Sequence, residues 1–83
     1  MYSIVFSNSA ADDFRSLSKD NQQRVLAVLE RIRSRPKSFA TRLSGSKSYR
    51  IRVGDLRVIL DIYERDQKIL VLKIGNRENV YST

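Results

Sequence analysis

The sequence contains no cysteine and no histidine. The chain therefore has no disulfide bond, no thiol nucleophile, no zinc site of the usual Cys/His kind and no imidazole to act as a general base. Any catalytic chemistry must use arginine, lysine, tyrosine or carboxylate side chains. We expect neither a metal ion nor another cofactor.

Long apolar runs are also missing. None approaches the roughly 20 residues that a transmembrane helix needs, and residues 1–6 lack the charged leader, apolar segment and cleavage site of a secretory signal. We therefore expect a cytoplasmic protein without membrane association. A chain of 83 residues, 41% of them hydrophobic, is long enough for one sheet and two helices in a single domain, residues 1–83.

Acidic residues are scarce relative to basic ones. The chain has 9 Asp and Glu against 16 Lys and Arg, 11 of them Arg, for a net charge of +7. Between Arg15 and Arg52 there are 11 basic residues and only 2 acidic ones. The guanidinium group pairs bidentately with phosphate, so the excess indicates a polyanionic partner or an acidic protein. Such a charge also serves simply to keep a small domain soluble.

The N-terminal segment predicts a strand followed by a helix. Residues 2–6 alternate weakly and are rich in β-forming side chains. Ser9 is predicted to begin the helix, because Ser9 and Asp12 have the Ser-x-x-acid spacing of a capping box. This first helix is short and is expected to end near Ser18.

A second helix is predicted from about Lys19 or Asp20 to the stop at Pro36. Its apolar face consists of Val25, Val28, Leu29 and Ile32. The opposite face carries a basic stripe of Arg24, Arg31 and Arg35. The link to the first helix is so short that the two helices should form an antiparallel hairpin.

The C-terminal half changes to a period of two. Residues 37–48 are polar and predict a loop that holds Phe39 and Leu43 against the core. Three strands joined by tight turns follow. They are expected at residues 49–53, 56–63 and 68–74, the last of them a central strand because it is almost entirely apolar.

The predicted fold is of the α+β class, in the order β-α-α-β-β-β. The last three strands form an antiparallel meander sheet, and the N-terminal helical hairpin packs on one of its faces. On the opposite face the alternation places Arg50 and Arg52 beside Arg57 of the neighbouring strand. Three clustered guanidinium groups repel one another and so indicate a bound anion, although an ordinary solvated sheet face also accommodates them.

Two segments resemble the RelE/ParE toxin superfamily. Residues 49–59, YRIRVGDLRVI, are similar to its signature hairpin. Residues 74–81, IGNRENVY, are similar to its closing segment, in which a glycine is followed by a basic residue and then a tyrosine. Both follow a helical hairpin that ends in Arg-x-Pro, so the resemblance covers almost the whole chain and implies a RelE-like fold.

Resemblance to the RelE branch implies the toxin of a type II toxin–antitoxin system. Such a toxin is a metal-independent endoribonuclease, or mRNA interferase, that cuts messenger RNA on the ribosome with the RNA 2′-hydroxyl as nucleophile. The resemblance also implies a cognate antitoxin, and binding to operator DNA only as the toxin–antitoxin complex.

The catalytic positions that the resemblance implies are Arg57, Arg77 and Tyr81. The two arginines would bind the charge that builds on the phosphoryl oxygens in the transition state. Tyr81 would act as a base if neighbouring arginines stabilise its phenolate, or would stack on an RNA base.

The chain departs from the superfamily pattern at three positions. Arg50 and Arg52 stand where better-characterised ribosome-dependent relatives carry lysines, and Asn76 stands where many carry histidine or lysine. These changes remove possible proton carriers, because arginine stays protonated and an amide only hydrogen bonds. Lys47 is a possible substitute, and Lys47, Arg50 and Arg52 are the predicted RNA-binding residues.

Two other functions remain open from the sequence. ParE-like proteins share the scaffold and inhibit DNA gyrase by binding it without cutting RNA, in which case the arginines would form a docking surface. A plain nucleic-acid-binding module would place the stripe of Arg24, Arg31 and Arg35 on phosphates and show steep salt dependence without cleavage. The tail tyrosine and the Arg-x-Arg strand favour the RelE branch.

Overall fold

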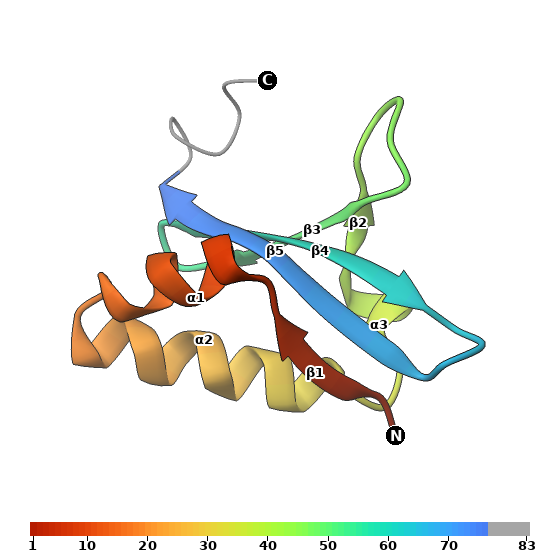
Figure 1. The fold of residues 1–83 in the computed structure, drawn as a ribbon, viewed down its shortest axis with the longest axis horizontal. Helices are drawn as coiled ribbons and strands as arrows, with labels where there is room; N and C mark the ends of the chain where they lie inside the picture. Colours follow the sequence, from red (N-terminus) through yellow and green to blue (C-terminus); the bar gives the residue numbers. More distant parts are fainter. Residues whose placement is uncertain (77–83) are drawn as a thin grey trace.

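The computed structural model describes residues 1–76. Its elements are β1 (Ser3–Phe6), α1 (Asn8–Arg15), α2 (Lys19–Ile32), α3 (Pro36–Phe39), β2 (Thr41–Arg42), β3 (Tyr49–Val53), β4 (Leu56–Tyr63) and β5 (Lys68–Asn76). The five strands form one sheet in the order β1-β5-β4-β3-β2 (Figure 1). Strands β3, β4 and β5 are antiparallel neighbours, so the predicted α+β class and its meander are confirmed.

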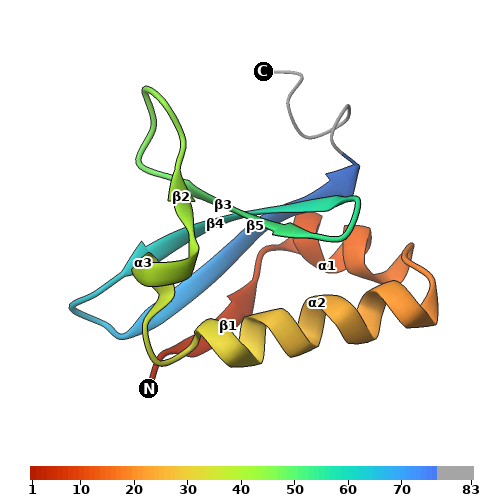
Figure 2. The same ribbon diagram turned by 180° about the vertical axis from the view of Figure 1, so that it is seen from behind.

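The core lies between α2 and the sheet. Figures 1 and 2 show α1 and α2 on the same side of the sheet, running in opposite directions as the predicted hairpin requires. Apolar residues at helical spacing on α2 and at alternate positions on the strands are buried there. They include Val25, Leu29, Ile32, Ile51, Val53, Leu56, Val58, Leu60, Ile69, Val71 and Ile74. No helix within residues 1–76 is long and apolar enough to cross a membrane.

Strand β1 lies at the edge of the sheet, parallel to β5, with Ser3 opposite Lys68. Beyond the end of β1, Ser7 and α1 lie along the same edge of β5. The hydroxyl of Ser7 donates to the carbonyl of Leu72 at 3.1 Å, and the carboxylate of Asp13 accepts the backbone N–H of Ile74 at 3.0 Å. Side chains of α1 and of the residue before it therefore satisfy backbone groups of β5 that β1 does not reach.

A β-bulge interrupts the pairing of β4 with β5 and leaves Leu72 without a partner in the ladder. Strict alternation from Val71 would turn Lys73 toward the core and Ile74 away from it. The extra residue reverses this outcome, so Ile74 is 3% exposed and Lys73 is exposed. The bulge thus keeps the end of β5 in the core.

The cap of α1 differs from the predicted one. The hydroxyl of Ser7, not of Ser9, accepts the N–H of Ala10 at 3.0 Å, and the helix begins at Asn8 and ends at Arg15. Both serines precede apolar helical positions, but β1 is held against β5 up to Phe6, so the chain leaves the sheet and turns at the next residue. Helix α2 begins at Lys19, as predicted, and is capped by the hydroxyl of Ser18.

The segment 37–48 is not the plain loop that its polarity predicts. Helix α2 ends at Ile32, and Pro36 begins the short helix α3, where its fixed φ is suitable and its missing N–H costs nothing. A two-residue strand, β2, follows and pairs with β3. Phe39 is 51% exposed instead of packed against the core, whereas Leu43 is partly buried.

Replacing Ser7 with alanine is expected to lower the free energy of unfolding by about 1 kcal/mol, the usual cost of losing a helix cap. Replacing Ser9 with alanine is expected to change it by less than about 0.5 kcal/mol. Urea denaturation followed by circular dichroism measures both values. Equal losses for the two variants would contradict the assignment of the cap to Ser7.

Candidate functional site

The arginine cluster lies on the outer face of the sheet, opposite the helices. Arg50 and Arg52 are on β3, Arg57 is on β4, and Arg52 is directly opposite Arg57 in the antiparallel register. Directly opposite residues point to the same face of a sheet. The structure therefore brings together the three arginines that the alternation of the sequence places on one face.

Arg57 is far less accessible than a residue on an open sheet face would be. It is 4% exposed and is the one charged residue that is buried within residues 1–76. Strand β4 is in the middle of the sheet, and the residue opposite Arg57 on β5 is Gly75, which has no side chain. Arg57 and Arg50 each have an interaction partner, as a buried or partly buried charge requires.

The remaining predicted RNA-binding residues are more accessible. Arg50 is partly buried and Arg52 is exposed. Lys47 is exposed on the loop between β2 and β3, which projects on the side of the sheet away from the helices in both views (Figures 1 and 2). This loop is closed by a backbone hydrogen bond from Leu43 to Ser48 at 2.9 Å. The loop that carries Lys47 therefore lies on the same side of the sheet as the arginine cluster.

The predicted catalytic residues Arg77 and Tyr81 lie outside the described residues, so their roles stay predictions. The described chain ends with Asn76, which is exposed and pairs with Leu56 at the end of β5. Asn76 follows Gly75, the residue opposite Arg57.

The carboxylate of Asp61, on β4, is held by two hydroxyl groups. It accepts hydrogen bonds from the hydroxyl of Ser48 at 2.7 Å and from that of Tyr63 at 3.3 Å. The negative charge of Asp61 raises the pKa of Tyr63, so this phenol stays protonated at neutral pH and does not serve as a base.

The geometry suits binding and charge stabilisation more than proton transfer. A guanidinium group held in a buried position is already oriented, and its attraction for an anion is stronger there than in bulk water. Arginine does not lose its proton at physiological pH. Within residues 1–76 no three His, Cys, Asp or Glu side chains gather into a possible metal site. The cluster is therefore equipped to hold a phosphate group.

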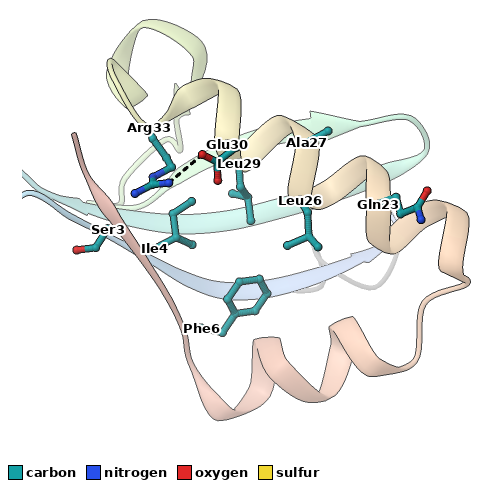
Figure 3. Close-up of a pocket in the computed structure, with 9 residues that line it drawn as sticks. All are labelled: Ser3, Ile4, Phe6, Gln23, Leu26, Ala27, Leu29, Glu30 and Arg33. Carbon is teal, nitrogen blue, oxygen red and sulfur yellow. Dashed lines mark hydrogen bonds and ion pairs between the residues drawn. The ribbon is translucent and has the colours of Figure 1, made fainter.

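A second concave surface lies on the helical side of the molecule, between β1 and α2. Figure 3 shows apolar side chains of both elements lining this groove, which has a volume of about 660 Å³. Polar groups border it, including the ion pair of Arg33 with Glu30 at 2.8 Å. Leu26 is 49% exposed within it. The sequence pattern alone did not reveal this groove, because it depends on how β1 and α2 are placed.

The same fold occurs in RelE toxins. The isolated Escherichia coli RelE toxin is similar with a TM-score of 0.83 and 22% sequence identity, over 99% of this chain and 93% of that one. RelE in the archaeal RelE–RelB complex from Pyrococcus horikoshii is 28% identical, with a TM-score of 0.77 over 92% of this chain and 94% of that one. A search of curated protein sequences found no match.

The fold and the sequence together define a toxin of the RelE/ParE superfamily. The sequence model of the family described as ParE toxin of type II toxin–antitoxin systems, parDE, matches residues 4–81. The chain belongs to this family. The superfamily resemblance of the strand hairpin and the closing segment is therefore confirmed.

Proposed function

We propose that this toxin is a metal-independent endoribonuclease that cuts messenger RNA on the ribosome, in the cytoplasm. The observation that carries the proposal is the buried Arg57 beside Arg50 and Arg52, on a sheet face that the helices leave uncovered. An uncovered face with converging guanidinium groups suits a strand of RNA, whose phosphates lie along its backbone.

In the proposed reaction the 2′-oxygen of one nucleotide attacks the adjacent phosphorus. The bond from phosphorus to the 5′-oxygen of the next nucleotide breaks, the 2′-hydroxyl proton is lost and the leaving oxygen gains a proton. Negative charge grows on the phosphoryl oxygens, where Arg57 binds it more tightly than in the ground state. By the superfamily resemblance, Arg77 adds a second guanidinium and Tyr81 a base or a stacking ring.

Primer-extension mapping tests this proposal. Messenger RNA is mapped in translating extracts with and without ribosomes, after addition of the toxin or its Arg57→Ala variant. We expect new 5′ ends in phase with codons that require ribosomes and are lost in the variant. Messenger RNA that stays intact with active toxin would refute the nuclease function.

A second candidate function is inhibition of DNA gyrase without RNA cleavage. The match of residues 4–81 to the ParE toxin family favours it. The arginine cluster would then be a docking surface, because a fold shared between two functional classes does not fix the activity. Gyrase-dependent DNA breaks in cells whose messenger RNA is intact would establish this function in place of the first.

The proposed partner is a cognate antitoxin, and operator DNA is bound only by the complex of the two proteins. RelE is seen with RelB in the Escherichia coli and Pyrococcus horikoshii complexes. The net charge of +7 suits an acidic segment, and the apolar groove between β1 and α2 suits the apolar side of an amphipathic one. We therefore propose that the antitoxin covers the groove.

Replacing Leu26 with glutamate is expected to weaken antitoxin binding about 30-fold or more, because it places a charge in the apolar groove that the antitoxin would cover. Leu26→Met keeps the side chain apolar and should retain nearly full affinity. Isothermal titration calorimetry measures both affinities, and RNA cleavage should be the same in the two variants. Unchanged antitoxin affinity of Leu26→Glu would exclude the groove as the contact surface.

A further inference from the structure

A hollow of about 380 Å³ lies at the outer edge of β3, next to the arginine cluster. Within residues 1–76, β2 pairs with β3 only at Tyr49 and Arg50, and no described strand covers the edge of β3 beyond them. The hollow occupies this place, between β3, α2 and α3. The residues that line it include Arg31, Ile32, Phe39, Thr41, Arg50 and Arg52.

The hollow is strongly basic. Three arginines line it, Arg31 from α2 and Arg50 and Arg52 from β3, and none of its lining residues is acidic. Arg31 and Arg52 are exposed, and no carboxylate of residues 1–76 is in an ion pair with either of them. The Thr41 hydroxyl adds a hydrogen-bond donor. An anion with several oxygens, such as a phosphate group, fits these donors.

An aromatic ring stands beside the charges. Phe39, the last residue of α3, lines the hollow and is 51% exposed. Pro36 at the other end of α3 is buried, which fixes the short helix and keeps the ring at the surface. An exposed ring next to phosphate-binding groups is the usual arrangement for stacking a base of single-stranded nucleic acid.

We propose that the hollow binds one nucleotide of single-stranded RNA, with the phosphate on Arg31 and Arg52 and the base on Phe39. The inference rests on the proposed nuclease function and extends it. Arg52 is opposite Arg57 in the sheet and also lines the hollow, so it connects the two places. The RNA strand runs from the cleavage site across Arg52 and over the edge of β3. The nucleotide belongs to messenger RNA beside the cleaved bond or to ribosomal RNA.

The test compares four variants with the wild-type toxin. Arg31→Gln removes one charge of the hollow, and Arg65→Gln removes one from the exposed turn between β4 and β5 as a matched control. Phe39→Ala removes the ring, and Phe39→Trp keeps a stacking surface. Binding is measured on two probes: a 12-nucleotide 2′-fluoro RNA, which lacks the attacking hydroxyl, and ribosomes free of messenger RNA.

We expect Arg31→Gln to weaken binding about tenfold and to reduce the slope of log affinity against log salt by about 0.7, the value for one phosphate contact on a single strand. Phe39→Ala should weaken binding about fivefold or more, and Phe39→Trp should retain it. Arg65→Gln should change affinity less than about twofold, because it removes charge without removing a contact. Weaker binding of these variants to the oligonucleotide would assign the nucleotide to messenger RNA. Weaker binding to ribosomes alone would assign it to ribosomal RNA.

The proposal is overturned if, on both probes, Arg31→Gln binds with the same affinity as Arg65→Gln and Phe39→Ala binds with the same affinity as the wild-type toxin. It is also overturned if Arg31→Gln weakens only antitoxin binding, since the hollow would then be a protein-binding surface. Ribosome-dependent cleavage by the same wild-type preparation separates the nucleotide-site hypothesis from the nuclease hypothesis. If the wild-type toxin cleaves RNA and the variants bind RNA as well as it does, only the nucleotide site in the hollow is refuted. If the wild-type toxin does not cleave RNA, the nuclease function is refuted. Thermal unfolding followed by circular dichroism confirms that each variant is folded.

Discussion

Replacing Arg57 with alanine is expected to lower the rate of ribosome-dependent RNA cleavage by about 100- to 1,000-fold, the usual cost of removing one preorganised donor to a developing oxyanion. The side chain is 4% exposed, so its guanidinium is fixed before the RNA arrives and needs little rearrangement in the transition state. Single-turnover cleavage at saturating ribosome concentration measures the chemical step separately from binding.

Two further variants distinguish charge from geometry at Arg57. Arg57→Lys keeps the positive charge but loses the planar pair of donors, so its rate should lie between those of wild type and Arg57→Ala. Arg65→Ala removes an exposed arginine from a turn and should retain full activity. Because Arg57 is buried, each variant must also show a native thermal unfolding curve. A folded Arg57→Ala variant with the wild-type cleavage rate would show that Arg57 is structural.

Replacing Leu60 with alanine is expected to lower the free energy of unfolding by about 2 to 5 kcal/mol, through lost burial and the cavity that remains. Leu60 is 0% exposed in β4, with Tyr49 of β3 and Val71 of β5 opposite it. A small domain is stable by only about 5 to 15 kcal/mol, so this variant should lose a large share of its stability. Urea denaturation followed by circular dichroism measures the loss.

Leu26→Ala is the matched control for Leu60→Ala, since the same atoms are removed from a side chain that is 49% exposed. The change should stay within about 0.5 kcal/mol, and alanine is a good helix former at this position in α2. Similar losses at the two positions would mean that Leu60 is not part of a tightly packed core.

The arginine cluster was predictable because strands have a period of two. Once residues 49–53 and 56–63 are recognised as a hairpin, the side on which Arg50, Arg52 and Arg57 lie follows from alternation alone. The burial of Arg57 was not predictable in this way. It depends on the neighbours across the sheet, and the register that places Gly75 opposite Arg57 is set by the whole meander.

The helices and the edges of the sheet were less predictable. Two serines near the start of α1 are both suitable N-caps by sequence. Ser7 is the cap because β1 pairs with β5 up to Phe6 and the chain turns at the next residue. The exposure of Phe39 follows from Pro36. The sequence predicts that a helix ends at this proline, whereas in the structure the proline begins the short helix α3. The hollow beside Phe39 is therefore a feature that local sequence patterns do not reveal.

The parallel pairing of β1 with β5 has a consequence for synthesis of the toxin. Ser3 pairs with Lys68, 65 positions later, and closing so long a segment slows folding because entropy is lost before the contacts form. Ribosomes add roughly 5 to 20 residues per second, from the N-terminus. Until β5 emerges, β4 has β3 as its one neighbour and Arg57 lacks half of its surroundings. A nascent chain therefore cannot assemble this part of the sheet around Arg57 before β5 has been synthesised.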